Sequence, residues 1–155
     1  MNWTTLFATV SGAVIALGSA LFVERQKGRQ ERVTEWRRTR RELYSGYLAA
    51  VATARNELIA LLLDRDRPLS ELSREARTAV STCYGPRYEL EILAPSAVAG
   101  PAASLFRCLR ALRNAVADGV VVGTPESDRI TMEYDNALDA AREAMRRDLA
   151  RDTPS

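Results

Sequence analysis

Apolar residues follow two patterns along this chain, an uninterrupted run near the N-terminus and a spaced pattern after it. The run covers residues 3–23, WTTLFATVSGAVIALGSALFV, which are 21 positions without a charged side chain. As a helix it would be about 31 Å long, which matches the hydrocarbon core of a bilayer. We therefore predict an uncleaved transmembrane helix with Trp3 at the outer interface. The alternatives are a cleavable signal peptide, which would begin with a positively charged region, and a buried core helix, which would be shorter and carry a polar edge.

Beyond Trp36, apolar residues recur at steps of three and four, which is typical of one face of an amphipathic helix. Four such stretches follow one another, the first ending near Asp64, and no stretch alternates in the manner of a strand. The four predicted buried faces are Leu43, Tyr47, Ala50, Ala54, Leu58 and Leu61; Leu69, Leu72, Ala76, Ala79, Val80 and Cys83; Val98, Ala102, Leu105, Leu109, Leu112 and Val116; and Ile130, Tyr134, Leu138, Ala141, Met145 and Leu149.

Glycine and proline residues mark the predicted helix boundaries. The second helix should break at Gly85-Pro86, leaving Arg87–Leu93 as a short extra helical piece. The start of the third helix stays open, because Ser96 is a good cap but places Pro101 inside the helix. The fourth start is clearer, since Thr124-Pro125 combines a capping residue with a proline at the first helical position.

These patterns predict an all-α protein, in which a single N-terminal transmembrane helix runs into a long amphipathic helix. An antiparallel bundle of about four helices follows, because short connections favour antiparallel neighbours. We predict residues 1–23 as the transmembrane anchor, 24–41 as a basic juxtamembrane helix, 42–150 as the helical bundle and 151–155 as a disordered tail.

The segment 24–41, ERQKGRQERVTEWRRTRR, carries eight basic and three acidic residues, whereas the whole chain has a net charge of +2. The basic residues directly after the apolar run, predicted to determine topology, are Arg25, Lys27, Arg29 and Arg32. The positive-inside rule places their side of the membrane in the cytoplasm and the N-terminus outside. Two lone cysteines, Cys83 and Cys108, favour the same reducing compartment. An extracytoplasmic stalked domain with inverted topology is the alternative.

The second half of the basic segment needs a different interpretation, because it would lie over about 20 Å from the bilayer in a straight helix. Charges are screened within about 8 Å at physiological salt. The residues concerned are Arg37, Arg38, Arg40 and Arg41. They form either a solvated helix face or a surface for an acidic partner, or they reach lipids if the chain bends at Gly28. No groove-reading motif accompanies them, so we expect no nucleic-acid partner.

The composition gives little support for a catalytic or cofactor-binding site. The chain has no histidine, and its single lysine is Lys27. These absences remove histidine-dependent nucleophiles and make a metal centre or a Schiff base improbable. Carboxylate pairs exist at Asp64 and Asp66, Glu89 and Glu91, and Asp135 and Asp139, and they read as solvated positions. We predict no enzyme, cofactor, metal or small-molecule substrate; an enzyme that uses carboxylates alone is the remaining catalytic alternative.

Small residues recur every fourth position in the apolar run, at Ala8, Gly12, Ala16 and Ala20. Such a strip lets two transmembrane helices approach closely, which would make the chain a homo-oligomer. The alternative is that these residues simply face lipid.

The chain resembles uncharacterised single-pass membrane proteins of high-GC actinobacteria. Three features together carry this resemblance: the uncharged N-terminal anchor, the stretch WRRTRRELYSGYLAAVATA and the stretch YELEILAPSAVAGPAASLFRCLRAL. The resemblance implies the same architecture and carries over no functional residue. From the residues themselves we predict a membrane-tethered cytoplasmic interaction or scaffold module that contacts the bilayer and either docks a protein partner or self-associates.

Overall fold

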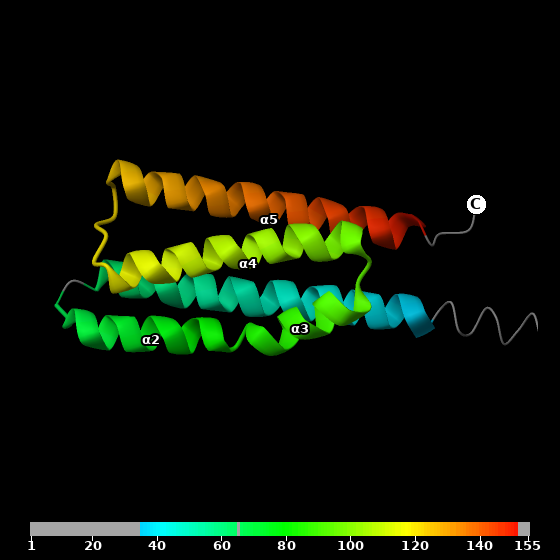
Figure 1. Cartoon of the computed structure of the whole chain (residues 1–155), viewed down its shortest axis with the longest axis horizontal. Helices are drawn as coiled ribbons and strands as arrows, with labels where there is room; N and C mark the ends of the chain where they lie inside the picture. The colour runs from blue at the N-terminus through cyan, green and yellow to red at the C-terminus, as the bar shows by residue number, and fades with distance from the viewer. Residues whose placement is uncertain (1–34, 65, 152–155) are drawn as a thin grey trace, which may run out of the picture. The chain divides into compact units, whose positions relative to one another are not determined.

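The structure, a computed structural model, describes residues 35–64 and 66–151. These residues form a first helix, Glu35–Leu63, then α2 (Leu69–Ser81), α3 (Tyr84–Leu93), α4 (Ser96–Ala117) and α5 (Pro125–Arg151) (Figure 1). The described ranges contain no strand, so the all-α prediction is confirmed. The predicted transmembrane helix over 3–23 and residues 152–155 of the tail lie outside them.

The chain divides into two units, Met1–Thr39 and Arg40–Ser155. Of the first unit only Glu35–Thr39 is described, as helix, with the Thr39 hydroxyl donating to the Glu35 carbonyl at 3.0 Å. The second unit is the bundle. Its consecutive helices run in opposite directions, except that α2 and α3 follow one another along the same side (Figure 1). The predicted antiparallel bundle is therefore confirmed.

The predicted apolar faces form the core of this bundle. All six residues predicted for the face of α4 are buried, and Tyr47, Tyr134 and Phe106 are among the largest fully buried side chains. Leu69 is an exception, because it stands exposed in the first turn of α2. Its side chain lies 3.1 Å from the position that a Cβ on Gly119 would occupy, so it covers the end of α4 instead of entering the core.

The break between α2 and α3 lies earlier than predicted. α2 ends at Ser81, and α3 begins at Tyr84 with Gly85-Pro86 in its first turn. The first intrahelical bond runs from the Arg87 N–H to the Cys83 carbonyl at 3.0 Å. Proline is tolerated here because N–H groups in a first turn have no intrahelical acceptor. The prediction of a break at Gly85-Pro86 was therefore wrong.

Helix α4 begins at Ser96 and keeps Pro101 in its interior. The cost is one hydrogen bond, because Pro101 has no N–H to donate to the carbonyl of Ala97. Gly100 relieves part of the steric conflict, since it has no Cβ for the proline ring to meet; the conflict with the Ala97 carbonyl remains. Burial of Val98 and Ala102 on both sides of this position holds the helix together.

The connection between α4 and α5 is specified by two glycines with positive φ, Gly119 at 70° and Gly123 at 86°. The Val120 N–H donates to the Ala115 carbonyl at 2.9 Å, which closes α4 in a Schellman motif. The Thr124 hydroxyl accepts the Ser127 N–H at 3.3 Å, confirming the predicted start of α5. The loop between the glycines is thus held firmly at both ends.

Among the described residues, the first helix is long and apolar enough to cross a membrane by length and composition. It is not the segment for which that role was predicted. Its residues Tyr47, Val51, Ala54 and Leu58 are fully buried in the bundle. Its apolar stripe therefore belongs to the bundle core.

Candidate functional site

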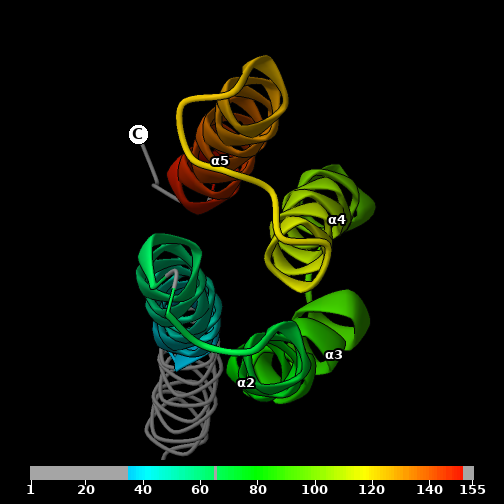
Figure 2. The ribbon, with the colours of Figure 1, turned by 90° about the vertical axis from the view of Figure 1, so that its left-hand side faces the viewer.

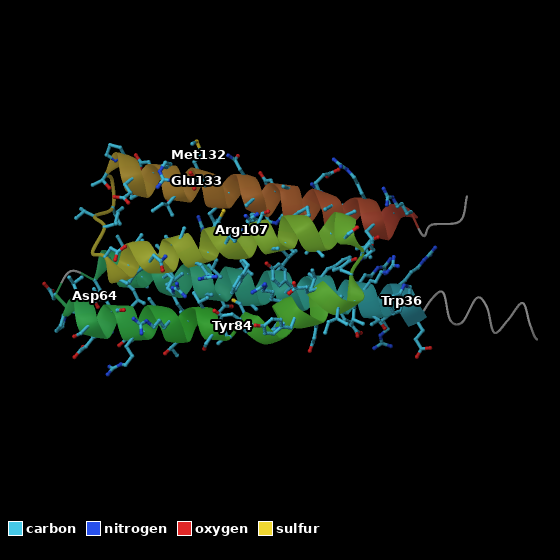
Figure 3. All side chains as sticks on the ribbon, in the orientation of Figure 1. Trp36, Asp64, Tyr84, Arg107, Met132 and Glu133 are labelled. Carbon is cyan, nitrogen blue, oxygen red and sulfur yellow. The ribbon has the colours of Figure 1, made fainter. Side chains whose placement is uncertain are left out.

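A recess of about 150 Å³ opens at the end of the bundle that carries the α4–α5 loop. It lies between the last turns of the first helix, the end of α4, the loop and the first half of α5. Figure 2 shows α5 leaning away from the first helix toward this end, and Asp64 marks the same end in Figure 3. The recess forms because these two helices diverge.

The floor of the recess is apolar and buried. Leu112 and Ala115 come from α4, and Ile130 and Tyr134 come from α5. Leu112, Ile130 and Tyr134 were predicted for the core faces of their helices, whereas Ala115 was not. All four are buried, and they line the recess from below. An apolar floor offers water few hydrogen-bond partners, so it accepts an apolar group readily.

The rim of the recess is apolar too, although it faces solvent. Leu63 is 63% exposed, Val122 is exposed, and Ile59 and Leu62 are half-buried. Val121 beside them is also exposed. Exposed apolar side chains around a recess mark an interaction site more often than scattered ones do.

Polar groups at the recess are few, and most interact with each other. The Arg55 guanidinium lies 5.0 Å from the centre of the Tyr134 ring and 3.5 Å from the Asp135 carboxylate. Burial raises the pKa of Tyr134 to about 12, so its hydroxyl remains protonated at neutral pH. The Ser127 hydroxyl accepts the Gly123 N–H at 3.1 Å, which ties the loop to α5.

A second hollow, of about 430 Å³, lies between the first helix and α2. It is shallow, and four of its eight lining residues are charged: Glu57, Asp64, Arg67 and Glu75. Arg67 is already paired with Asp64 at 2.8 Å and with Glu75 at 2.7 Å. The recess, by contrast, has one charged residue in its lining, Arg55.

At the opposite end, a buried polar cluster joins the start of the bundle to the end of α5. The Asp148 carboxylate, 6% exposed, accepts the Tyr44 hydroxyl at 2.6 Å and an Arg40 N–H at 3.2 Å. Sequence reasoning missed Asp148. The signal was its position seven residues after Ala141 and fourteen after Tyr134, on the buried stripe of α5.

The predicted basic residues fare differently from one another. Arg40 forms the ion pair with Asp148, Arg38 and Arg41 are exposed, and Arg37 is half-buried. The predicted topology residues Arg25, Lys27, Arg29 and Arg32, and the predicted packing residues Ala8, Gly12, Ala16 and Ala20, lie outside the described residues.

Both cysteines are free thiols. Cys83 is fully buried, and burial raises its pKa above the ordinary value. Cys108 is half-buried, its pKa is also raised by burial, and its thiol lies 3.6 Å from the Glu133 carbonyl. A thiol with a raised pKa is a poor nucleophile at neutral pH.

Within residues 35–64 and 66–151, no group of three or more His, Cys, Asp or Glu side chains is placed to hold a metal ion. No protein-family model matches this chain, and neither a curated protein nor a solved structure matches it. The geometry of the recess is therefore the basis for a functional conclusion.

Proposed function

We propose that this chain is a membrane-tethered helical interaction module without catalytic activity, and that its recess docks a protein partner on the cytoplasmic side. The observation that carries the proposal is the apolar recess with an exposed apolar rim. The rim valines stand on a loop fixed by Gly119 and Gly123, so they are presented to solvent by a specified conformation.

The groups around the recess favour docking over catalysis. A catalytic site needs a nucleophile or an acid–base pair facing the substrate. The lining supplies one arginine, which is engaged with Tyr134 and Asp135, and the hydroxyls of Ser127 and Thr131. Such a lining suits an apolar side chain better than a reacting group.

The tether in this proposal is the apolar segment 3–23, and the orientation follows from the basic residues after it. Self-association of the transmembrane helices through the strip from Ala8 to Ala20 would be a separate contact.

Site-specific photo-cross-linking in membranes tests the docking site. A photoreactive amino acid at Val122 should yield a discrete product heavier than the chain. The matched control is Met132, which is 60% exposed and lies on the outer face of α5 in Figure 3. Products of equal yield at both positions, or none at Val122, would contradict the proposal.

A further inference from the structure

We infer that the docking element of the partner is a cationic amphipathic helix of another protein, which inserts one large apolar side chain into the recess. This inference rests on the proposed function and names the chemistry of its partner. A cavity of about 150 Å³ has the volume that holds benzene. One leucine, methionine or phenylalanine side chain therefore fills it.

The two walls of the recess have the spacing of helix faces. Arg55, Ile59 and Leu62 follow one another at steps of four and three along the first helix. Ser127, Thr131 and Tyr134 do the same along α5. Each of the two helices therefore presents one face to the recess, and together they form the sides of a groove. A third helix can lie in such a groove and direct its own apolar residues at positions i, i+3 or i+4 inward.

The negative charge of the α5 wall favours a positively charged partner. Asp128 and Asp135 lie three residues before and four residues after Thr131, so they flank it on the same helix face. Both are exposed. The segment 118–135 contains five acidic residues and a single arginine, and that residue, Arg129, pairs with Glu133 at 2.7 Å.

The first-helix wall does not offset this acidic excess. Residues 55–67 contain three basic and three acidic residues and so add no net charge, although Arg55, 3.5 Å from Asp135, partly neutralises that carboxylate. A helix with lysine or arginine beside its apolar anchor meets the carboxylates of α5. An acidic helix would be repelled, which costs affinity and slows association.

A second copy of this chain fits less well. The same acidic wall would face itself in a symmetric pair. Arg40 and Arg41 of a second copy would not compensate for this repulsion, because they lie at the other end of the bundle: Arg41 and Leu63 are separated by 22 residues of one helix, which is about 33 Å.

The test uses the full chain in nanodiscs of zwitterionic lipid and three synthetic helical peptides with one shared apolar stripe. Their polar positions carry lysine and arginine, glutamine, or glutamate. Fluorescence anisotropy should show the cationic peptide binding at least about tenfold more tightly than the glutamate peptide. This preference should shrink as the salt concentration rises.

Two variants with matched controls locate the binding. Asp128→Asn with Asp135→Asn should weaken the cationic peptide about tenfold. Glu71→Gln with Glu89→Gln changes the net charge equally at exposed positions outside the recess lining and should have no effect. Thr131→Trp, which fills the recess from its rim, should weaken all peptides, and Leu63→Ser serves as a second variant if circular dichroism shows that Thr131→Trp is misfolded.

The other outcomes overturn the inference. All three peptides could bind with equal affinity and lose binding in Thr131→Trp. This result would show a docking groove that does not select by charge, and it would be consistent with the proposed function. Failure of every peptide to bind the folded chain would reject the cationic helix, while cross-linking at Val122 decides the proposed function independently. A dimer in sedimentation that dissociates in Thr131→Trp would identify a second copy as the occupant.

Discussion

Asp148 shows how a single residue determines which end of the bundle is closed. Its carboxylate joins the first helix to α5 through Tyr44 at 2.6 Å and Arg40 at 3.2 Å. At the other end of α5, Arg55 and Asp135 face each other across the recess at a longer distance of 3.5 Å. The polar contacts between the first helix and α5 are therefore shorter and more deeply buried at the Asp148 end than beside the recess.

Replacing Asp148 should therefore destabilise the bundle more than replacing an exposed acidic residue would. Asp148→Ala leaves the buried Tyr44 hydroxyl and the Arg40 guanidinium without this acceptor, and we expect a loss of about 1.5–3 kcal/mol in the free energy of unfolding. The matched control is Asp139→Ala on the same helix, whose side chain is 80% exposed; it should change stability by less than about 0.5 kcal/mol. Urea denaturation followed by circular dichroism measures both. Equal losses would contradict the structural role of Asp148.

Buried tyrosines make the stability of the bundle depend on alkaline pH. Burial raises the pKa of Tyr134 from 10.0 to about 12, and it raises the pKa of Tyr47 as well. Above pH 10 the unfolded chain releases protons that the folded chain retains, so stability falls as pH rises, by at most about 1.4 kcal/mol per pH unit for each group. The contribution of Tyr134 is fully present below pH 10 and is lost as the pH rises through about 12.

Thermal unfolding at a series of pH values measures this dependence. Tyr134→Phe should flatten the fall above pH 10, because it removes one of the linked protons. Tyr88→Phe, at an exposed tyrosine of α3, is the matched control. A profile that is the same in wild type and Tyr134→Phe would show that Tyr134 is not buried as described.

At the scale of elements, proline position decides which helices carry strain. Pro86 lies in the first turn of α3, whereas Pro101 lies in the interior of α4. Pro101→Ala restores a hydrogen bond to the Ala97 carbonyl, and we expect it to raise the free energy of unfolding by up to about 3 kcal/mol. Pro86→Ala restores no hydrogen bond. It should leave the free energy of unfolding unchanged or lower it by up to about 1 kcal/mol, because the unfolded chain gains conformational entropy. The account of α4 fails if denaturant titration shows no gain for Pro101→Ala.

Periodicity predicted the helices well because burial of an apolar stripe follows directly from spacing. Every predicted core position of α4 is buried, and the Thr124 cap is present. The errors lie at Gly85-Pro86 and Leu69, where the outcome depends on first-turn geometry and on a neighbouring helix end. The recess could not be predicted from spacing, because Leu112, Ile130 and Tyr134 have the spacing of ordinary core residues and are buried like them. They line a recess because the first helix and α5 diverge (Figure 2), which their spacing does not indicate.

In the complete sequence, a predicted membrane anchor precedes the described bundle. Residues 3–23 contain no charge, and an arginine at the centre of a transmembrane helix costs about 3 kcal/mol on insertion scales. Val14→Arg should therefore lower the amount of protein that stays with membranes after an alkaline carbonate wash. Release of the unmutated chain by the same wash would remove the basis for a tether.

The central claim is that the recess is displayed to the cytoplasm by a bundle fixed to the membrane. Leu63 is 63% exposed at its rim, so Leu63→Cys reports the compartment better than the buried Cys83 or the half-buried Cys108, which is replaced by alanine in the same variant. The decisive measurement uses a membrane-impermeant maleimide, which is added either to intact cells or after lysis. Membranes are then washed with carbonate, and the label on the retained variant is measured. The account predicts labelling only after lysis. Efficient labelling of intact cells would place the recess outside and contradict the claim.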